Sequence, residues 1–137
     1  MIRKIDHIGI ATADPQLALA IYSKALGLVH EQTEEIESQK LRAYHLRVGE
    51  SHLELLEPTD PDSPVAKFIA KQGAGIHHIA LAVSDLAAMR EKLIAQGVTP
   101  LSPEPFVGAG GKQVQFFHPR TTGGVLLELC QPGEEQT

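Results

Sequence analysis

Apolar and polar residues follow the same succession of patterns twice along the chain. In the first half, residues 5–12 alternate as a strand does, and residues after Asp14-Pro15 carry apolar side chains at helical spacing up to Gly27. A polar turn or loop is expected at 34–39 and a tight turn at Gly49-Glu50. The remaining segments, each typical of a strand, are 28–33, 41–48 and 51–56. The first half is therefore predicted to form a β-α-β-β-β unit.

The second half repeats this plan. A strand at 77–83 precedes a helix that Asp85 caps and Gly97 ends, and the three strands expected after it are 98–101, 112–118 and 124–130. Between the halves, apolar residues at helical spacing (Val65, Phe68 and Ile69) predict one short helix within a linker.

Short motifs also recur at equivalent places. Asp6-His7-Ile8-Gly9-Ile10-Ala11 corresponds to His77-His78-Ile79-Ala80-Leu81-Ala82, and Glu54-Leu55-Leu56-Glu57-Pro58 to Glu128-Leu129-Cys130-Gln131-Pro132. We therefore predict an α+β fold in which two tandem β-α-β-β-β repeats form a curled eight-stranded mixed sheet around a metal-containing cleft. The predicted single domain, 1–137, comprises repeat one (4–58), a linker with a short helix (59–75), repeat two (76–132) and a C-terminal tail (133–137).

Composition excludes several classes of function. The net charge of -5 offers no basic stripe for nucleic acid, and no apolar run approaches the roughly 20 residues that a transmembrane helix needs. Cys130 is the single cysteine, so no intramolecular disulfide is expected. No signal-peptide pattern opens the chain. A soluble cytoplasmic protein is the resulting expectation.

Four residues at repeat-equivalent positions carry the candidate chemistry. His7 and His78 lie on the first strand of each repeat, and Glu54 and Glu128 on the fourth. An isolated strand histidine is more often a core residue, and an isolated glutamate more often faces solvent; the conjunction of four favours a metal site. Two imidazoles and two carboxylates neutralise a divalent ion and leave two octahedral positions open, which suits Co²⁺, Zn²⁺, Ni²⁺, Mn²⁺ or Fe²⁺. His77, one residue from His78, is predicted to point to the other face.

Several longer motifs resemble the methylmalonyl-CoA epimerases, a family within the vicinal-oxygen-chelate superfamily that also contains glyoxalase I. The resemblance spans roughly residues 5–132. The motifs that carry it are Ile5-Asp6-His7-Ile8-Gly9-Ile10-Ala11, Leu53-Glu54-Leu55-Leu56-Glu57-Pro58, Asp62-Ser63-Pro64-Val65-Ala66-Lys67-Phe68, Gly75-Ile76-His77-His78-Ile79, Phe117-His118-Pro119 and Thr122-Gly123-Gly124-Val125-Leu126-Leu127-Glu128-Leu129.

The resemblance implies interconversion of (R)- and (S)-methylmalonyl-CoA in propionate metabolism by a homodimeric enzyme that contains Co²⁺. A divalent ion would chelate the thioester and carboxylate oxygens and stabilise an enolate, while a general base removes the α-proton. Some family members carry a glutamate where this chain has Ala43. Glu128 is therefore the candidate catalytic base, and His45 or a water the second proton donor. Lys112 and Arg120, then Lys67 and Lys71, are candidate partners for the phosphates of CoA.

Three other functions remain open at this point. A glyoxalase I-like isomerase (lactoylglutathione lyase) would use the same fold and ligands, and an Fe(II) extradiol dioxygenase would need two histidines but only one carboxylate. A metal-free small-molecule-binding resistance protein of the same fold would have no need of the four ligands.

Overall fold

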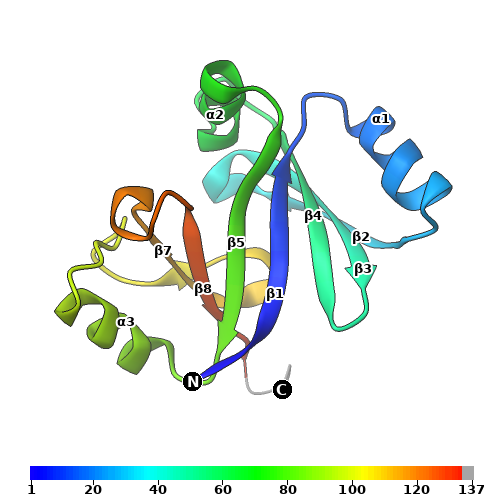
Figure 1. Cartoon of the computed structure of the whole chain (residues 1–137). Helices are drawn as coiled ribbons and strands as arrows, with labels where there is room; N and C mark the ends of the chain where they lie inside the picture. Colours follow the sequence, from blue (N-terminus) through cyan, green and yellow to red (C-terminus); the bar gives the residue numbers. More distant parts are fainter. Residues whose placement is uncertain (134–137) are drawn as a thin grey trace. The chain divides into compact units, whose positions relative to one another are not determined.

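The computed structural model describes residues 1–133; residues 134–137 of the predicted tail lie outside the described part. Figure 1 shows the chain. Its helices and strands, in chain order, are β1 (Ile2–Ala11), α1 (Pro15–Leu19) continued by a π-helix (Ala20–Ala25), β2 (Val29–Ile36), β3 (Leu41–Val48), β4 (Ser51–Pro58), α2 (Pro64–Gln72), β5 (Gly75–Val83), α3 (Leu86–Ala95), β6 (Phe106–Val107), β7 (Gln113–Phe117) and β8 (Leu127–Gln131).

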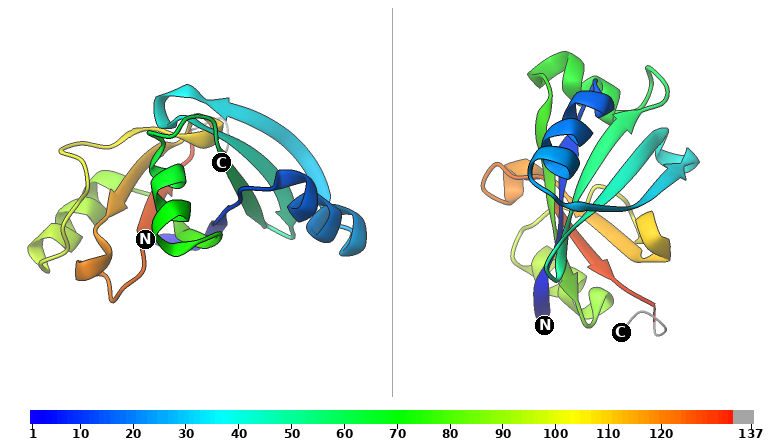
Figure 2. Two further views of the ribbon diagram at one scale, coloured as in Figure 1. Left: turned by 90° about the horizontal axis from the view of Figure 1, so that it is seen from above. Right: turned by 90° about the vertical axis from the view of Figure 1, so that its right-hand side faces the viewer.

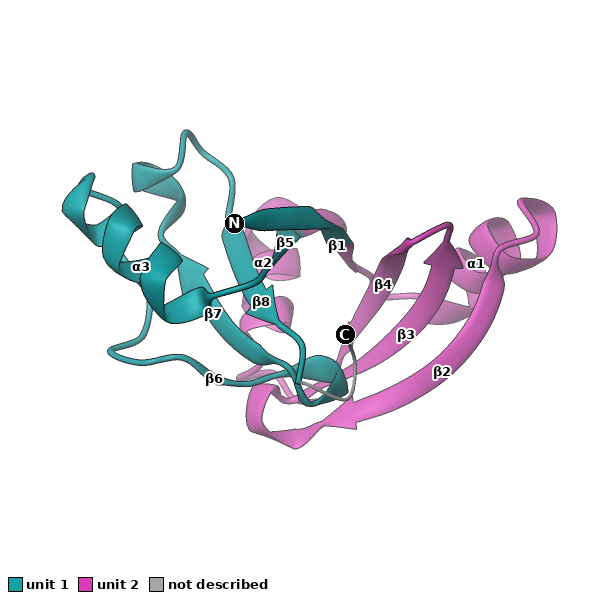
Figure 3. Ribbon diagram, turned by 90° about the horizontal axis from the view of Figure 1, so that it is seen from below, with its two compact units in different colours: residues 1–6, 78–137 teal, residues 7–77 magenta. Residues whose placement is uncertain are grey.

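The chain divides into two compact units. The first along the repeats, residues 7–77, is magenta in Figure 3, and the second, residues 1–6 with 78–137, is teal. In the first unit the strands pair in the order β2-β3-β4-β1, and in the second in the order β5-β8-β7-β6. Each unit has one parallel pair, β1 with β4 and β5 with β8, and its other pairs are antiparallel. The two units therefore share one topology, as the repeated pattern predicted.

Each long helix begins at a side chain that caps it. Asp14 accepts a hydrogen bond from the Leu17 amide at 3.1 Å, and Asp85 accepts one from the Ala88 amide at 3.0 Å. Ser63 is fully buried and accepts from the Val65 amide at 3.2 Å, ahead of Pro64 in the first turn of α2. These caps satisfy amides that have no partner within the helix, which explains why the predicted starts hold.

Three small cores attach the helices to their strands (Figures 1 and 2). In the first unit, α1 and the π-helix pack on Tyr44, Leu46 and Leu55, whereas α2 packs on a cluster around Ala43 and Leu56. In the second unit, α3 packs on a third set of residues, Val83, Phe117 and Leu129. None of the helices in residues 1–133 is both long enough and apolar enough to cross a membrane.

Two sequence predictions are wrong, one of them only in part. The turn expected at 34–39 is confirmed only at Glu37–Gln39, which form a 3₁₀-helix, whereas Glu34, Glu35 and Ile36 continue strand β2 and pair with β3. Residues 98–101 form only an isolated bridge, Pro100 with Phe117, and the second strand of the repeat is the later, two-residue β6. Pro100 is the bridged residue itself and has no amide hydrogen to donate to a longer ladder.

Candidate functional site

Within the unit of residues 7–77, the structure brings His7 and Glu54 together. The parallel pairing of β1 with β4 sets Gly9 opposite Glu54, two residues beyond His7. His7 Nδ1 lies 3.2 Å from Glu54 Oε2, and both side chains are more than nine-tenths buried. Since a buried carboxylate needs a compensating partner, the contact accounts for how Glu54 is tolerated there.

The other unit contains the equivalent pair. Pairing of β5 with β8 sets Ala80 opposite Glu128, again two residues beyond the histidine, His78. His78 Nε2 lies 3.1 Å from Glu128 Oε1, and both side chains are more than nine-tenths buried. Each repeat therefore supplies one buried imidazole and one buried carboxylate from the same two strand positions.

The prediction for His77 is confirmed, and Glu57 also has its contacts away from these pairs. His77 packs its ring against Phe68 of α2, with centroids 4.9 Å apart. Glu57 accepts hydrogen bonds from Tyr44 Oη at 2.8 Å and from Arg42 Nη1 at 3.0 Å. Burial and this hydrogen bond to a carboxylate raise the pKa of Tyr44 above its ordinary value.

His45 continues the His7–Glu54 pair into a longer polar chain. It lies directly opposite Glu54 in the pairing of β3 with β4, with Nδ1 3.5 Å from Glu54 Oε2. Its Nε2 lies 3.1 Å from Oε1 of Glu34 on β2. Burial alone lowers the pKa of His45, but the hydrogen bonds and negative charges of Glu54 and Glu34 outweigh it and raise the pKa above the ordinary value.

Glu34 is the residue that sequence reasoning missed. A turn at this position predicts no sheet face for the side chain. In strand β2, Glu34 pairs with Ala43 and its side chain lies on the same face as His45. The signal available was that residues 28–36 contain no glycine or proline, so a strand could continue through the polar end.

An aromatic residue occupies the corresponding place in the second repeat. Phe116 lies directly opposite Glu128 in the pairing of β7 with β8, as His45 lies opposite Glu54. The Phe116 ring meets the His78 ring edge-on at 5.3 Å and stacks with Phe106 at 6.2 Å. Glu128 thus has an apolar neighbour where Glu54 has an imidazole.

Lys112, a predicted phosphate partner, has a different contact in the structure. Its Nζ donates to both carboxylate oxygens of Asp6, each at 2.8 Å. The Asp6 side chain is only 6% exposed and that of Lys112 is 23% exposed, so this is a largely buried ion pair. Asp6 directly precedes His7, and the pair fixes the segment after Gly111 to β1.

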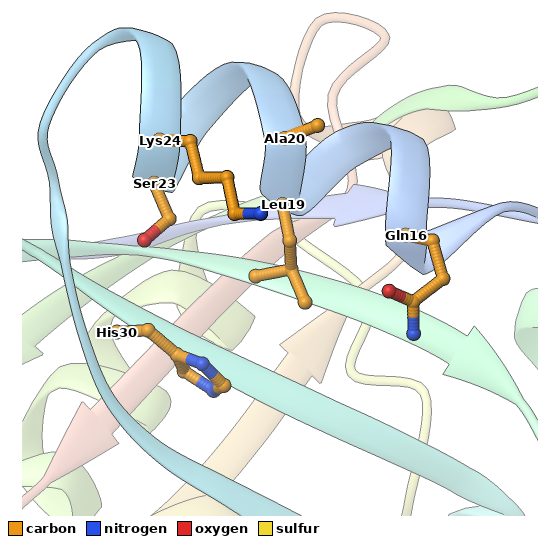
Figure 4. Close-up of a pocket in the computed structure, with 6 residues that line it drawn as sticks. All are labelled: Gln16, Leu19, Ala20, Ser23, Lys24 and His30. Carbon is orange, nitrogen blue, oxygen red and sulfur yellow. The ribbon is translucent and has the colours of Figure 1, made fainter.

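A separate pocket lies on the other face of the first unit (Figure 4). It has a volume of about 250 Å³, and its walls come from the helix after Asp14 and from β2. The residues that line it are Gln16, Leu19, Ala20, Ser23, Lys24 and His30. His30 contacts Tyr44 there, with ring centroids 5.8 Å apart, on the helix-covered face of the strands. This pocket is therefore separate from the place where His7 and Glu54 meet.

With this geometry established, comparison with known proteins gives the family. Residues 6–116 match the model of the Glyoxalase/Bleomycin resistance protein/Dioxygenase superfamily. The chain belongs to this superfamily. It is 41% identical to the uncharacterized protein YqjC of Bacillus subtilis, over 97% of this chain and 95% of that protein.

Two further relatives are methylmalonyl-CoA epimerases. The human mitochondrial enzyme is 36% identical over 93% of this chain and 73% of its own length. A variant of the Streptomyces coelicolor enzyme, solved in complex with 2-nitronate-propionyl-CoA, is 38% identical with a TM-score of 0.92, over 98% of this chain and 97% of that chain. The likeness over almost the whole chain confirms the predicted fold class and shows that the protein is related to the epimerases.

Proposed function

We propose that this protein is a metal-dependent epimerase that interconverts (R)- and (S)-methylmalonyl-CoA, with His7, Glu54, His78 and Glu128 as the ligands of one divalent ion. The observation that carries the proposal is the pair of buried His–Glu contacts at repeat-equivalent positions, 3.2 Å in one unit and 3.1 Å in the other. The relationship to methylmalonyl-CoA epimerases supports the choice of substrate.

The residues fit a metal ion by their chemistry. All four side chains are buried, and each repeat offers one imidazole and one carboxylate as ligands. Two carboxylates and two neutral imidazoles balance a doubly charged cation, and mixed nitrogen and oxygen ligands suit Co²⁺, the ion proposed, as well as Zn²⁺, Ni²⁺, Mn²⁺ or Fe²⁺. When bound, such an ion supplies Lewis-acid stabilisation to the enolate of the substrate.

The side chains of this protein would carry out the proton transfer. Glu128 is proposed as the base that accepts the α-proton, because as a ligand of the ion its carboxylate would lie beside the chelated substrate. His45 is the proposed second proton donor, since its imidazole lies beside Glu54 with a carboxylate at each ring nitrogen.

The test is α-proton exchange in D₂O. Protein loaded with Co²⁺ and protein treated with a chelator are each incubated with methylmalonyl-CoA, and deuterium uptake is followed by mass spectrometry. We expect rapid uptake of one deuterium by the metal-loaded protein alone. A folded, metal-loaded protein that exchanges no proton would refute the epimerase and favour the glyoxalase I-like isomerase.

Matched variants locate the chemistry. His7→Ala and Glu128→Ala should each abolish exchange, whereas Glu57→Ala should retain it because Glu57 contacts Tyr44 and Arg42 and not His7. Full exchange by His7→Ala with metal still bound would contradict the proposed ligands. The same proposal includes a homodimer, which the mass measured by light scattering during size-exclusion chromatography would test.

A further inference from the structure

The two halves of the proposed site differ in one position that the repeat makes directly comparable. Residue 45 lies opposite Glu54, and residue 116 lies opposite Glu128, each on the strand that pairs antiparallel with the strand of the glutamate. The first is histidine and the second is phenylalanine. The two carboxylates are thus equivalent in backbone position but not in their surroundings.

The surroundings of Glu54 restrict its carboxylate. Oε2 of Glu54 lies 3.2 Å from His7 Nδ1 and 3.5 Å from His45 Nδ1, so one oxygen is placed between two imidazoles. The His45 ring is itself held at its other nitrogen by Glu34, at 3.1 Å. The His45 side chain is 12% exposed, so this chain of contacts is largely shielded from water.

The ring of Phe116 cannot do the same for Glu128. A phenyl group donates no hydrogen bond and carries no charge, and this one is fixed by stacking on Phe106 and by its edge-on contact with His78.

We propose that Glu34 and His45 are positioning residues that hold Glu54 in place as a metal ligand. This inference rests on the proposed metal site. Polar groups that hold a metal ligand through a hydrogen bond orient it and raise its affinity for the ion, and losing one weakens binding by roughly 10- to 100-fold.

Glu34 acts through His45 and not on Glu54 directly. An imidazole ring that carries a proton on each nitrogen donates from Nε2 to Glu34 and from Nδ1 to Glu54, so the Glu34 carboxylate fixes the orientation of the ring. A carboxamide oxygen can accept the same hydrogen bond, whereas an alanine side chain cannot. The proposal therefore predicts that Glu34→Gln binds Zn²⁺ more tightly than Glu34→Ala does.

The experiment measures metal affinity in the absence of substrate. Wild type and variants compete with a fluorescent chelator for Zn²⁺ at fixed pH, and the melting temperature of each apo protein is recorded. His45→Phe installs the residue that the second repeat carries, and His30→Phe is the matched control, because His30 bonds to Thr33 and not to Glu54. We expect His45→Phe to weaken Zn²⁺ binding by about 10- to 100-fold and His30→Phe to leave it unchanged.

Metal affinity, compared between folded variants, separates positioning from a purely structural role. His45→Phe removes a contact from both Glu34 and Glu54 and should lower the apo melting temperature, so the comparison that isolates positioning is the Zn²⁺ affinity of Glu34→Gln against that of Glu34→Ala, each measured on folded protein. If His45→Phe does not fold, Glu34→Ala removes the contact with His45 Nε2 instead. Glu34→Gln is its control, because the carboxamide oxygen can still accept that hydrogen bond.

The outcomes distinguish this inference from the proposed function. Zn²⁺ affinity of His45→Phe and Glu34→Ala within about twofold of wild type, well short of the 10-fold minimum expected, would overturn the positioning role alone. Wild-type protein that binds no divalent ion would overturn both the role and the metal site. A wild type that binds Zn²⁺ and depends on His45, yet exchanges no proton of methylmalonyl-CoA, would support the positioning role and refute the epimerase.

Discussion

Replacing Lys112 with methionine should destabilise the apo protein by about 3 kcal/mol. The reason is the carboxylate that the substitution leaves behind. Lys112 Nζ contacts both oxygens of Asp6 at 2.8 Å, and the Asp6 side chain is 6% exposed. Without the ammonium group, the Asp6 carboxylate stays buried and loses a cation that contacts both of its oxygens.

The magnitude follows from the burial of the two partners. Removing one member of a buried ion pair costs about 3–5 kcal/mol. Lys112 is 23% exposed, so water can reach part of the vacated space and the lower end of that range applies. With a urea m-value of about 1–3 kcal/mol/M, a loss of 3 kcal/mol lowers the unfolding midpoint by about 1–3 M.

The assay is urea unfolding of the apo protein, followed by circular dichroism, with two controls. Lys67→Met removes an exposed lysine and should change the free energy of unfolding by less than about 0.5 kcal/mol. Adding Asp6→Asn to Lys112→Met should restore much of the loss, because no buried charge then remains unpaired. An unchanged midpoint in Lys112→Met, together with weaker binding of CoA, would refute the ion-pair reasoning and support the phosphate contact expected from the sequence.

Three further changes should have measurable effects. Ser63→Ala removes the cap of α2 and a 3.3 Å hydrogen bond to the Gln39 carbonyl, and should lower the free energy of unfolding by about 1–2 kcal/mol in urea titrations. The pKa of Tyr44 is raised in the folded protein, so its contribution to stability is complete below the unfolded pKa of about 10 and disappears as pH rises through the folded pKa. An ultraviolet titration should show one tyrosinate step above the ordinary range, and Tyr44→Phe should lack this step. Metal at 100 times its dissociation constant should stabilise the protein by about 2.7 kcal/mol, an effect that a chelator reverses in thermal melts.

The sequence predicted the repeated architecture because periodicity and helix caps are local signals. Asp14, Ser63 and Asp85 begin the three helices by bonding to amides two or three residues ahead, which a reader of the sequence can anticipate. The strand positions of His7 and Glu54 could also be expected, because alternation fixes the face of each residue once its strand is known.

Strand ends and cross-strand neighbours could not be predicted, because they depend on residues that are distant in sequence. The polar stretch at Glu34–Ile36 is a strand because β3 pairs with it. That pairing places Arg42 Nε 2.6 Å from Glu35 Oε1. The contact between Asp6 and Lys112 joins residues 106 positions apart. No local pattern marks such a pair.

The difference between His45 and Phe116 shows what a duplicated unit can and cannot supply. Duplication gives two glutamates at equivalent positions, and equivalence alone would give them equal basicity and equal freedom to move. The proposed reaction gives the two carboxylates different tasks, since both are proposed ligands and Glu128 alone is also proposed to accept the α-proton. Identical ligand residues cannot provide that difference, so it must come from their neighbours. In this chain the neighbours differ in kind: an imidazole held by Glu34 lies opposite Glu54, and a stacked phenyl ring lies opposite Glu128.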